Sequence, residues 1–377
     1  MSFRYRCALL LPAVVACGAA VIAAGVPSAG NGTIVLASYS RHLTAIDEAT
    51  EKVIAQIPLK NGIPWAVRPS ADRTRFYVQS ANQEQFEVVD YRSRQTVDTF
   101  TLSEGNRHVR VLAYDVDPQQ RVLMMVARTA TKQIDRFEIG TPEFIAYDLK
   151  EHKVIRTVPW SVDPEPQYYY LNLRYSPDGK FLYAFAHEIL VFDASTLQQV
   201  DSWNLSLPNE AGLNRFDLGS MDESGDEPGR FTGLFTMKDP VAGRKLLVVG
   251  SVNLGKKNIE FFPLGPTPTS GELSFALAPD RKHAYILREE IGEAEVWIVD
   301  MAGKRLQGKT TFKGRPRMAI RSSSNGQIVY IYEAGNTIDL YEADSFKYLR
   351  TITLESDMMY GTFNVIRPAK ALPPSAQ

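Results

Sequence analysis

The sequence predicts an all-β protein, a seven-bladed β-propeller whose ring is closed by a C-terminal strand that joins the N-terminal blade. Three observations lead to this prediction. After residue 30, apolar and polar residues alternate with the period of a β-strand, and long runs with a helical period are absent. Strand-like segments recur at a long spacing and are separated by acidic turns. Aromatic residues make up 10% of the chain, which suits pleated surfaces that pack flat rings.

One half of the repeated unit is an apolar run that ends in an acidic residue and is followed by a turn and another strand. Examples are VVDYRSRQTVDTF from Val88 and VFDASTLQQVDSW from Val191. Four short strands in a unit of roughly 40 to 50 residues are typical of a propeller blade. The acidic residues that mark the units are Asp47, Asp90, Asp148, Asp193, Asp300 and Glu342.

The other half of the unit is a turn followed by a strand, as in RPSADRTRFYVQS from Arg68 and YSPDGKFLYAFAH from Tyr175. The longest step between two of the acidic residues is about twice the others, so it is expected to hold one further unit. FTGLFTMKDPVAGRKLLVVG from Phe231 and IEFFPLG from Ile259 supply the strands of that unit. Seven units result.

The two ends of the predicted ring complement each other. The first unit, from Thr33, has too few strands, and MMYGTFNVIRP from Met358 is a strand without a unit of its own. A C-terminal strand that completes the N-terminal blade removes the open edges of the ring. We therefore expect one propeller domain over residues 30–368 and a disordered tail over residues 369–377.

Residues 1–29 have the pattern of an export signal, in which a basic start is followed by an uncharged stretch from Cys7 to Val26. Two alternatives stay open. VVAC, which ends at Cys17, loosely fits a lipoprotein cleavage site with Cys17 as the lipidated residue. The apolar run is also nearly long enough to remain as a membrane anchor. A cleaved signal is the favoured interpretation, and it predicts a periplasmic or secreted protein.

Cys7 and Cys17 are the two cysteines of the chain, and both lie in the predicted signal. After cleavage, the chain would have no disulfide, no thiolate nucleophile, no cysteine metal site and no covalently attached haem. Cysteine-poor exported domains fit a bacterial periplasm. The net charge of −1 argues against a nucleic acid partner and against membrane contact beyond an N-terminal anchor.

SPDGKFLYAF from Ser176 and VFDASTLQQV from Val191 resemble the repeats of YVTN-type β-propellers. The order of motifs is similar to that in the β chain of quinohemoprotein amine dehydrogenases. RFEIGTPEFIAYDL from Arg136 closes a long excursion in the third blade, and RFTGLFTM follows an acidic loop in the fifth. The resemblance covers roughly residues 33–368. It implies a propeller that helps to wall an active site, with quinone and haem carried by other subunits and no cofactor in this chain.

The carboxylates of the repeated turns are interpreted as structural. Asp178 in SPDG and Asp193 in FDAS can accept hydrogen bonds from backbone groups two residues further on. Carboxylates that recur once in each blade lie too far apart around the ring to act as a pair. The acidic stretch FDLGSMDESGDEPGR from Phe216 has part of the spacing of a calcium loop but lacks its glycine and its final glutamate, so we expect a solvated loop, with a calcium site or a partner surface as the alternatives.

The five histidines form no H-x-H or H-E-x-x-H pair. The chain also contains no G-x-S-x-G, Walker or G-x-G-x-x-G motif. We therefore predict no metal site, and no catalytic residues of the common hydrolase or nucleotide-binding classes.

The segments that lead into the innermost strands would rim one mouth of the central channel. They hold arginines interleaved with aromatic residues, in a chain of net charge −1. Guanidinium groups bind carboxylate or phosphate, so this rim is expected to bind an anionic small molecule or another protein subunit. A solvated or internally ion-paired face is the alternative. The candidate residues are Arg107, His108, Arg110, Tyr168, Tyr169, Arg230, Arg315, Arg317 and Tyr360.

Two functional hypotheses follow. The first is an exported, non-catalytic propeller used for binding or as a scaffold, which the family resemblance specifies as the β subunit of a periplasmic amine dehydrogenase. The second is a stand-alone propeller enzyme of the lactonase or lyase type that works from the channel mouth. In that case His108 would be the general acid or base, with Arg107 and Arg315 as charge stabilisers. The absence of catalytic motifs favours the first hypothesis.

Overall fold

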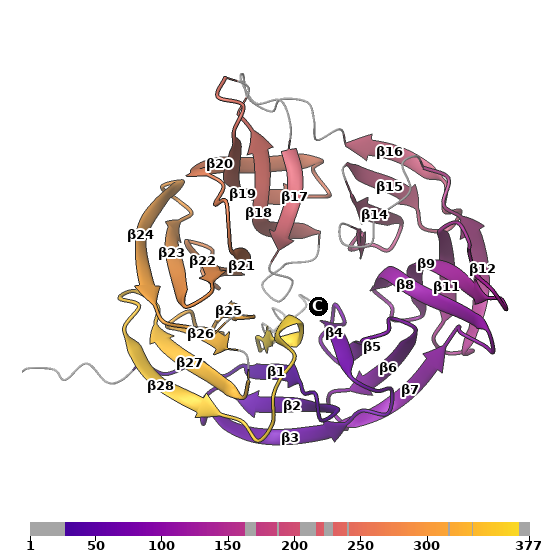
Figure 1. The fold of residues 1–377 in the computed structure, drawn as a ribbon, viewed down its shortest axis with the longest axis horizontal. Helices are drawn as coiled ribbons and strands as arrows, with labels where there is room; N and C mark the ends of the chain where they lie inside the picture. Colours follow the sequence, from indigo (N-terminus) through magenta and orange to yellow (C-terminus); the bar gives the residue numbers. More distant parts are fainter. Residues whose placement is uncertain are drawn as a thin grey trace, which may run out of the picture.

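The computed structural model describes residues 27–162, 171–186, 188–203, 216–221, 229–239, 241–315, 317–333 and 335–368, with the backbone alone for 216–221. Within these residues, the strands form seven antiparallel sheets arranged in a ring (Figure 1). Each sheet is one blade, with an innermost strand near the ring axis and an outermost strand at the periphery. The predicted all-β, seven-bladed propeller is confirmed.

Blades 1 to 3 follow the order of the chain, except that the innermost strand of blade 1 comes from the C-terminal end. Blade 1 consists of β29, β1, β2 and β3, and blade 2 of β4 to β7. Blade 3 consists of β8, β9, β11 and β12, and the short β10 pairs with the far end of β9. The strands are β29 Asn364–Ile366, β1 Thr33–Ala37, β2 His42–Asp47, β3 Lys52–Pro58, β4 Pro64–Pro69, β5 Arg75–Ser80, β6 Gln85–Asp90, β7 Gln95–Thr101, β8 Arg107–Val116, β9 Val122–Lys132, β10 Phe137–Ile139, β11 Glu143–Asp148 and β12 Lys153–Pro159.

Blades 4 to 7 each consist of four consecutive strands, of which the first is innermost. A short 3-10 helix, η2 (Tyr360–Thr362), precedes β29. The strands are β13 Asn172–Tyr175, β14 Phe181–Phe185, β15 Ile189–Asp193, β16 Gln199–Trp203, β17 Phe216–Met221, β18 Arg230–Lys238, β19 Lys245–Asn253, β20 Asn258–Pro266, β21 Glu272–Leu277, β22 His283–Glu290, β23 Glu293–Asp300, β24 Arg305–Phe312, β25 Ala319–Ser322, β26 Ile328–Glu333, β27 Thr337–Glu342 and β28 Tyr348–Thr353.

The ring is closed by β29, which pairs with β1 and places Val365 opposite Ile34. The backbone N–H of Ala37 also donates a hydrogen bond of 2.8 Å to Thr362 Oγ1, across a sequence separation of 325 residues. The pairing of β29 with β1 gives blade 1 its fourth strand. The predicted closure by a C-terminal strand is confirmed.

The fifth blade confirms one expectation and corrects another. The segments from Phe231 and Ile259 form its outer strands, as predicted for the further unit. However, the acidic stretch from Phe216 does not begin as a loop, because residues 216–221 form β17, the innermost strand of this blade. FDLGSM begins with the apolar–polar alternation of a strand. The acidic and small residues that follow interrupt this alternation, so the strand is difficult to recognise in the sequence. Residues 222–228, which contain the first positions compared with a calcium loop, lie outside the described residues, whereas Gly233, which stands where that loop has its final glutamate, lies in β18.

The hydrophobic core is divided into clusters that lie between neighbouring blades. Between blades 7 and 1, the buried rings of Tyr330 and Tyr332 pack against Phe363. Each blade therefore buries both of its faces, and apolar burial holds it to two neighbours. This packing keeps the innermost strands fixed around the ring axis, where the side chains of a site can converge.

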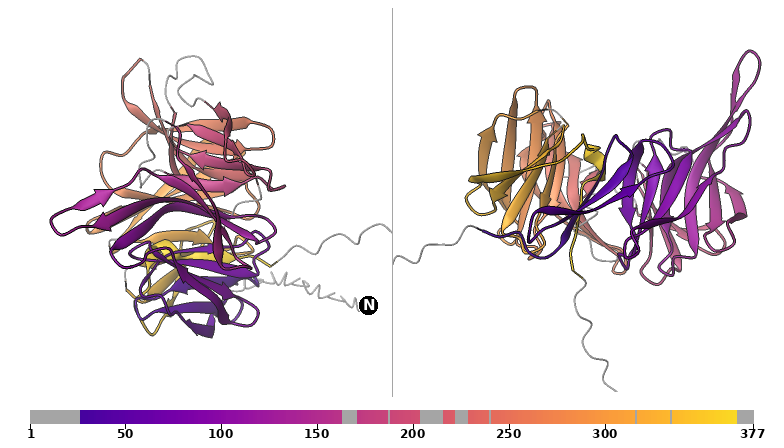
Figure 2. Two further views of the ribbon diagram at one scale, coloured as in Figure 1. Left: turned by 90° about the vertical axis from the view of Figure 1, so that its right-hand side faces the viewer. Right: turned by 90° about the horizontal axis from the view of Figure 1, so that it is seen from below.

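The antiparallel strands give the ring two different faces. On the loop face, the innermost strands begin, and the segments between blades and the connections between second and third strands lie there. On the turn face, the innermost strands end, and the short turns from first to second and from third to fourth strands lie there. The hairpin of β9 and β10 extends beyond the ring on the loop face (Figure 2).

Residues 1–26 of the predicted export signal lie outside the described residues. Cys7, Cys17 and the predicted tail over residues 369–377 all lie outside the described residues. Within the part of the chain that is described, no helix has the length and apolar character needed to cross a membrane.

Candidate functional site

Most of the predicted rim residues lie on the loop face. The innermost strand β8 contains three of them near its start, and the other three flank the beginnings of β25 and β29. These six residues are Arg107, His108, Arg110, Arg315, Arg317 and Tyr360. Tyr168 and Tyr169 lie outside the described residues.

The prediction for Arg230 is wrong in its placement. Arg230 begins β18, which is the second strand of blade 5 and pairs with the end of β17 through Gly233. Because second strands begin where innermost strands end, Arg230 lies on the turn face. The error follows from treating residues 216–221 as a loop, which would make β18 the innermost strand.

A cavity of about 550 Å³ opens on the loop face between blades 7 and 1. Arg315 and Arg317 line it with exposed side chains, and Tyr39, from the connection between β1 and β2, is 42% exposed beside them. Arg317 has a φ of 64°, a left-handed conformation that costs on the order of 1–3 kcal/mol for a residue other than glycine.

A second cavity of about 190 Å³ shares Tyr360 with the first. Two glutamates of blade 6 meet there, because Glu272 of β21 lies directly opposite Glu289 of β22. Glu289 is 9% exposed and accepts a hydrogen bond of 2.7 Å from the backbone N–H of Met318. Burial raises the pKa of Glu289, and the neighbouring Glu272 raises it further.

Tyr360 is the residue on which these groups converge. Burial raises the pKa of its phenol, Glu272 and Glu289 raise it further, and Arg317 lowers it. The phenol therefore keeps its proton at neutral pH and can donate a hydrogen bond. Together the two cavities offer carboxylates, guanidinium groups and a phenol to a polar ligand or to a partner surface.

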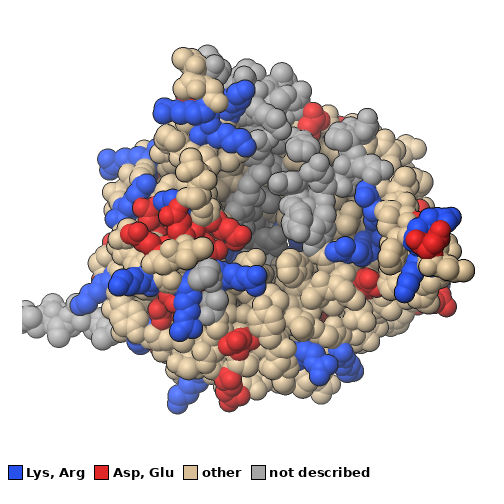
Figure 3. Space-filling view, in the orientation of Figure 1, with Lys and Arg blue, Asp and Glu red and all other residues tan. Residues whose placement is uncertain are grey.

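The loop face is more acidic than the sequence predicts. Figure 3 looks onto this face and shows acidic side chains gathered over β21 to β23, with basic side chains on both sides. Glu272 begins β21, Glu290 ends β22 and Glu293 begins β23. Glu272 could have been found from the sequence, because it is the first residue of ELSFAL in the sixth unit. Glu289 lies on a second strand, and the sequence contains no signal that it faces Glu272.

A different arrangement lies between blades 2 and 3, where His108 Nδ1 is 3.1 Å from Glu84 Oε2. The same carboxylate oxygen accepts a hydrogen bond of 2.8 Å from Ser103 Oγ. The side chain of His108 is 41% exposed. A carboxylate that orients a histidine leaves the second ring nitrogen able to transfer a proton. Glu84 could not be predicted as a partner of His108 from the sequence, because it lies in a loop of the preceding blade.

The two arginines near His108 are held by neighbouring groups. Arg107 Nη1 donates a hydrogen bond of 2.9 Å to the carbonyl of Leu102, and Arg110 Nη2 donates one of 2.9 Å to Gln83 Oε1. Arg315 and Arg317 belong to a different pair of blades. The predicted rim thus divides into two clusters, one at blades 2 and 3 and one at blades 6, 7 and 1.

Exposed apolar side chains are unevenly distributed. Among the described residues, sixteen large apolar side chains are exposed, of which eight lie on the loop face, seven on outermost strands and one, Phe181, on the turn face. The loop-face set is Tyr39, Ile63, Trp65, Ile134, Phe137, Ile139, Val241 and Ile291.

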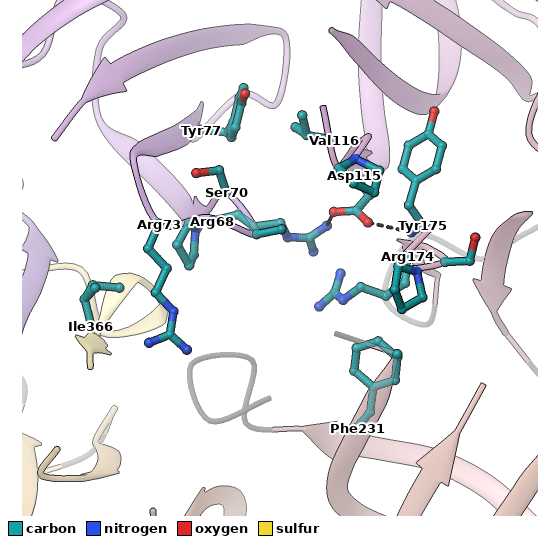
Figure 4. A pocket seen from close by; sticks show the side chains of 16 residues that line it. Arg68, Ser70, Arg73, Tyr77, Asp115, Val116, Arg174, Tyr175, Phe231 and Ile366 are labelled. Atoms are coloured by element: carbon teal, nitrogen blue, oxygen red, sulfur yellow. Dashed lines mark hydrogen bonds and ion pairs between the residues drawn. The ribbon is translucent and has the colours of Figure 1, made fainter. Parts of the chain in front are cut away.

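The turn face has a cavity of about 230 Å³ where the innermost strands of blades 2, 3 and 4 end. Arg68, Asp115 and Arg174 converge on it (Figure 4). Arg68 Nη1 lies 3.6 Å from Asp115 Oδ1, and the backbone N–H of Tyr175 donates a hydrogen bond of 2.7 Å to Asp115 Oδ2. The guanidinium of Arg174 lies 5.6 Å from the ring centroid of Phe231.

The charges of this cavity influence one another. Burial raises the pKa of Asp115, whereas Arg174 and Arg68 lower it. None of these residues was predicted as a site residue. The signal in the sequence is an arginine that comes shortly before the turn in three repeats, RPSADR, RYSPDG and RSSSNG.

The repeated turns have the hydrogen bonds that a structural role requires. Asp178 Oδ1 accepts hydrogen bonds from Ser176 Oγ at 2.6 Å and from the Lys180 N–H at 3.2 Å. Asp193 Oδ1 accepts hydrogen bonds from two backbone N–H groups, and such contacts lower the pKa of both aspartates. Among the described residues, no group of three or more His, Cys, Asp or Glu side chains is arranged to hold a metal ion.

Comparison with known proteins identifies the fold and not a family. No protein-family model and no curated protein matches the sequence. The chain is similar to the structure of a functionally unknown protein from Desulfotomaculum acetoxidans, with 15% identity, a TM-score of 0.52, and 90% of this chain and 100% of that chain covered. It is similar to dihydro-heme d1 dehydrogenase NirN in complex with DHE, with 14% identity, a TM-score of 0.51, and 88% of this chain and 76% of that chain covered.

A third similar structure is hydrazine synthase from Kuenenia stuttgartiensis, with 13% identity, a TM-score of 0.49, and 90% of this chain and 99% of that chain covered. At such low identities a likeness shows the fold alone. The resemblance to YVTN-type repeats and to the amine dehydrogenase β chain stays a prediction.

Proposed function

We propose that the protein is an exported, non-catalytic β-propeller that acts as a binding or scaffold subunit, and that it binds its partner through the loop face. One observation carries the proposal. The loop face exposes eight large apolar side chains of the described residues, whereas the turn face exposes one. Exposed apolar surface bordered by polar groups marks protein–protein interaction sites.

The composition of the loop face supports this proposal. Helix η2 contacts both β1 and β4, so Tyr39, Trp65 and Tyr360 belong to one surface. Trp65 is 40% exposed, and the exposed guanidinium groups of Arg315 and Arg317 lie on the same face. Tryptophan, tyrosine and arginine are the residue types that contribute most of the free energy at protein interfaces.

The hairpin of β9 and β10 adds a projecting element to this surface. Ile134, Phe137 and Ile139 are 107%, 60% and 58% exposed. β10 pairs with β9 along one edge, and no described strand pairs with its other edge. An apolar hairpin with an open edge can dock against a partner by side-chain contact and by strand addition.

More specifically, we propose that the chain is the β subunit of a periplasmic amine dehydrogenase, with quinone and haem on partner subunits. The order of motifs along the chain supports this form. An anionic small molecule held by Arg315 and Arg317 is the alternative ligand for the same face.

Native co-purification tests the proposal. The full chain, isolated from its own host under mild conditions, is expected to bring along a second subunit, and the amine dehydrogenase form requires haem absorbance in that complex. Trp65→Ala and Arg317→Ala should release the partner. Phe181→Ala, which removes the exposed ring of the turn face, should retain it. A chain that elutes alone from every native extract contradicts the scaffold role.

A second candidate function is a stand-alone enzyme of the lactonase or lyase type, and the contact between His108 and Glu84 favours it. In this case His108 acts as the general acid or base, with Glu84 as the residue that positions its ring. His152 provides a matched control, because its Nδ1 lies 3.1 Å from Asp98 Oδ2 in the same kind of pair on the turn face.

A panel of lactones assayed with the purified chain distinguishes the two functions. If the enzyme hypothesis holds, His108→Ala lowers the rate by about 100-fold or more, because general acid–base groups contribute effects of this size. His152→Ala should leave the rate unchanged. Absence of turnover across the panel, or equal rates in both variants, excludes His108 as a catalytic residue for these substrates.

A further inference from the structure

We propose that the turn-face cavity binds a small anion, a carboxylate or a phosphate, between Arg68, Arg73 and Arg174. The cavity of about 230 Å³ lies at the ends of the innermost strands. It is separate from the loop face, so this proposal does not depend on the function proposed for that face.

The geometry of the cavity is suited to an anion. Figure 4 shows the guanidinium groups of Arg68, Arg73 and Arg174 turned toward the cavity from two blades. Arg174 Nη1 is fixed by hydrogen bonds of 2.6 Å to Asn172 Oδ1 and 2.7 Å to the carbonyl of Leu173. Guanidinium groups oriented in advance bind an anion with little further loss of side-chain entropy.

Arg73 is the arginine best placed to bind an anion, because Arg68 and Arg174 already contact Asp115 or other groups. The Nη1 group of Arg73 donates a hydrogen bond of 3.0 Å to the carbonyl of Arg367. A guanidinium has five N–H donors, so Arg73 retains donors for a ligand.

Among the described residues, positive charge prevails around the cavity. Its described lining contains three arginines and a single carboxylate, that of Asp115. Burial lowers the pKa of Arg73, and the positive charge of Arg367 lowers it further. Cations that are partly buried and close together are costly unless negative charge lies near them. A bound anion supplies that charge at the place where Arg73 points.

The chemistry and size of the site limit the ligand. Guanidinium groups match the paired oxygens of carboxylates and phosphates. Phe231 and Ile366 add apolar walls to the same cavity. Its volume of about 230 Å³ is below the roughly 300–1,000 Å³ of sites for larger ligands, which favours a compact anion.

Isothermal titration of the full chain with succinate, citrate and inorganic phosphate in low-chloride buffer tests this proposal. At least one of the three anions is expected to bind, and the preferred one distinguishes a carboxylate ligand from a phosphate. Arg73→Gln should weaken that binding by about tenfold or more, since it removes a charge-assisted hydrogen-bond donor. Arg121→Gln, an exposed arginine of the same face outside the cavity, should change it less than twofold.

Arg73→Lys keeps the charge but lacks the forked donors, and it is expected to bind more weakly than the unmodified chain and more tightly than Arg73→Gln. It also provides a folded variant to measure if Arg73→Gln unfolds. The proposal is overturned if the unmodified chain binds none of the three anions, or if Arg73→Gln and Arg73→Lys bind as tightly as it does. Partner binding at the loop face should be the same in all of these variants, so the two proposals can fail separately.

Discussion

The two faces of the ring are built from the same strands, but they differ in how their side chains are held. On the turn face, short turns recur around the ring, and aspartates such as Asp178 and Asp193 bind the backbone in the same way. On the loop face, the connections differ in length from blade to blade, and apolar side chains are exposed on them.

Because of this difference, the two faces are suited to different kinds of binding site. Near the ring axis, the charged groups of the turn face, Arg68, Asp115 and Arg174, come from strands and are held by an ion pair and by hydrogen bonds. The surface of the loop face comes mainly from connections, which can change without disturbing the blades. A small, preorganised pocket suits the first arrangement, and a broad partner surface suits the second.

The turn face should be the place where one substitution costs most stability. Glu48 is fully buried and accepts hydrogen bonds from the Gly32 N–H at 2.8 Å and from Tyr330 Oη at 2.9 Å, which ties blade 1 to blade 7. Glu48→Ala leaves these donors buried without an acceptor, and it is expected to lower the free energy of unfolding by about 3 kcal/mol or more. Urea unfolding measures this loss.

The control for Glu48 is Glu104→Ala, which removes an exposed carboxylate of the loop face and should change the free energy of unfolding by about 0.5 kcal/mol or less. Similar losses in the two variants would remove the stability difference between the faces.

Partner affinity should show the opposite dependence on the two faces. Trp65→Ala is expected to weaken binding of the co-purified partner by about 2 kcal/mol, because exposed tryptophans often dominate interfaces. Phe181→Ala, on the turn face, should leave the affinity unchanged. Surface plasmon resonance with the partner immobilised gives both values, and a larger effect from Phe181 would move the interface to the turn face.

Anion binding in the turn-face cavity should depend on pH through Asp115. The folded-state pKa of Asp115 is raised above its ordinary value of 3.8, so this carboxylate takes up a proton at a higher pH in the folded chain than in the unfolded chain. Affinity for sulfate, whose charge is constant in this range, is therefore expected to rise as pH falls through the folded-state pKa.

Asp115→Asn lacks this titration and should bind sulfate severalfold more tightly than the unmodified chain at neutral pH. Titrations at a series of pH values compare the two proteins. The same pH dependence in both would show that another group is responsible.

The smallest expected effect is on acid stability. Hydrogen bonds from the side chain and backbone of Ser195 and from the backbone of Thr196 hold the pKa of Asp193 below 3.8. Its contribution to stability is therefore present above 3.8 and is lost as pH falls through the lowered folded-state value. Asp193→Asn should be slightly less stable at neutral pH and should lose less stability on acidification, as measured by urea unfolding at both pH values. A steeper loss in the variant would contradict the structural role of this turn.

The fold could be predicted because the residues that recur along the sequence lie in the turns of the turn face. Asp47, Asp90, Asp193 and their equivalents keep the same turn chemistry in blade after blade, and the sequence shows that chemistry directly. The strand over residues 216–221 escaped prediction because acidic and small residues hide its alternation. Misplacing that one strand was enough to assign Arg230 to the wrong face.

The candidate sites were less predictable, because their partners come from different blades. His108 could be singled out by its type, whereas its contact with Glu84 depends on how blade 2 lies against blade 3. Glu289 faces Glu272 only through the register of β21 and β22. Arg68 and Arg174 looked like ordinary strand residues, and it is the curvature of the ring that brings them to one cavity.

The pairing of β29 with β1 also sets the order in which the chain can fold. Hydrogen bonds across 325 residues cannot form until nearly the whole sequence is free to fold, and such long-range contacts slow folding. Until then, blades 1 and 7 leave apolar surface uncovered, including Tyr330 and Tyr332. The chain should therefore stay prone to aggregation until Ile366 has reached its place beside Thr33.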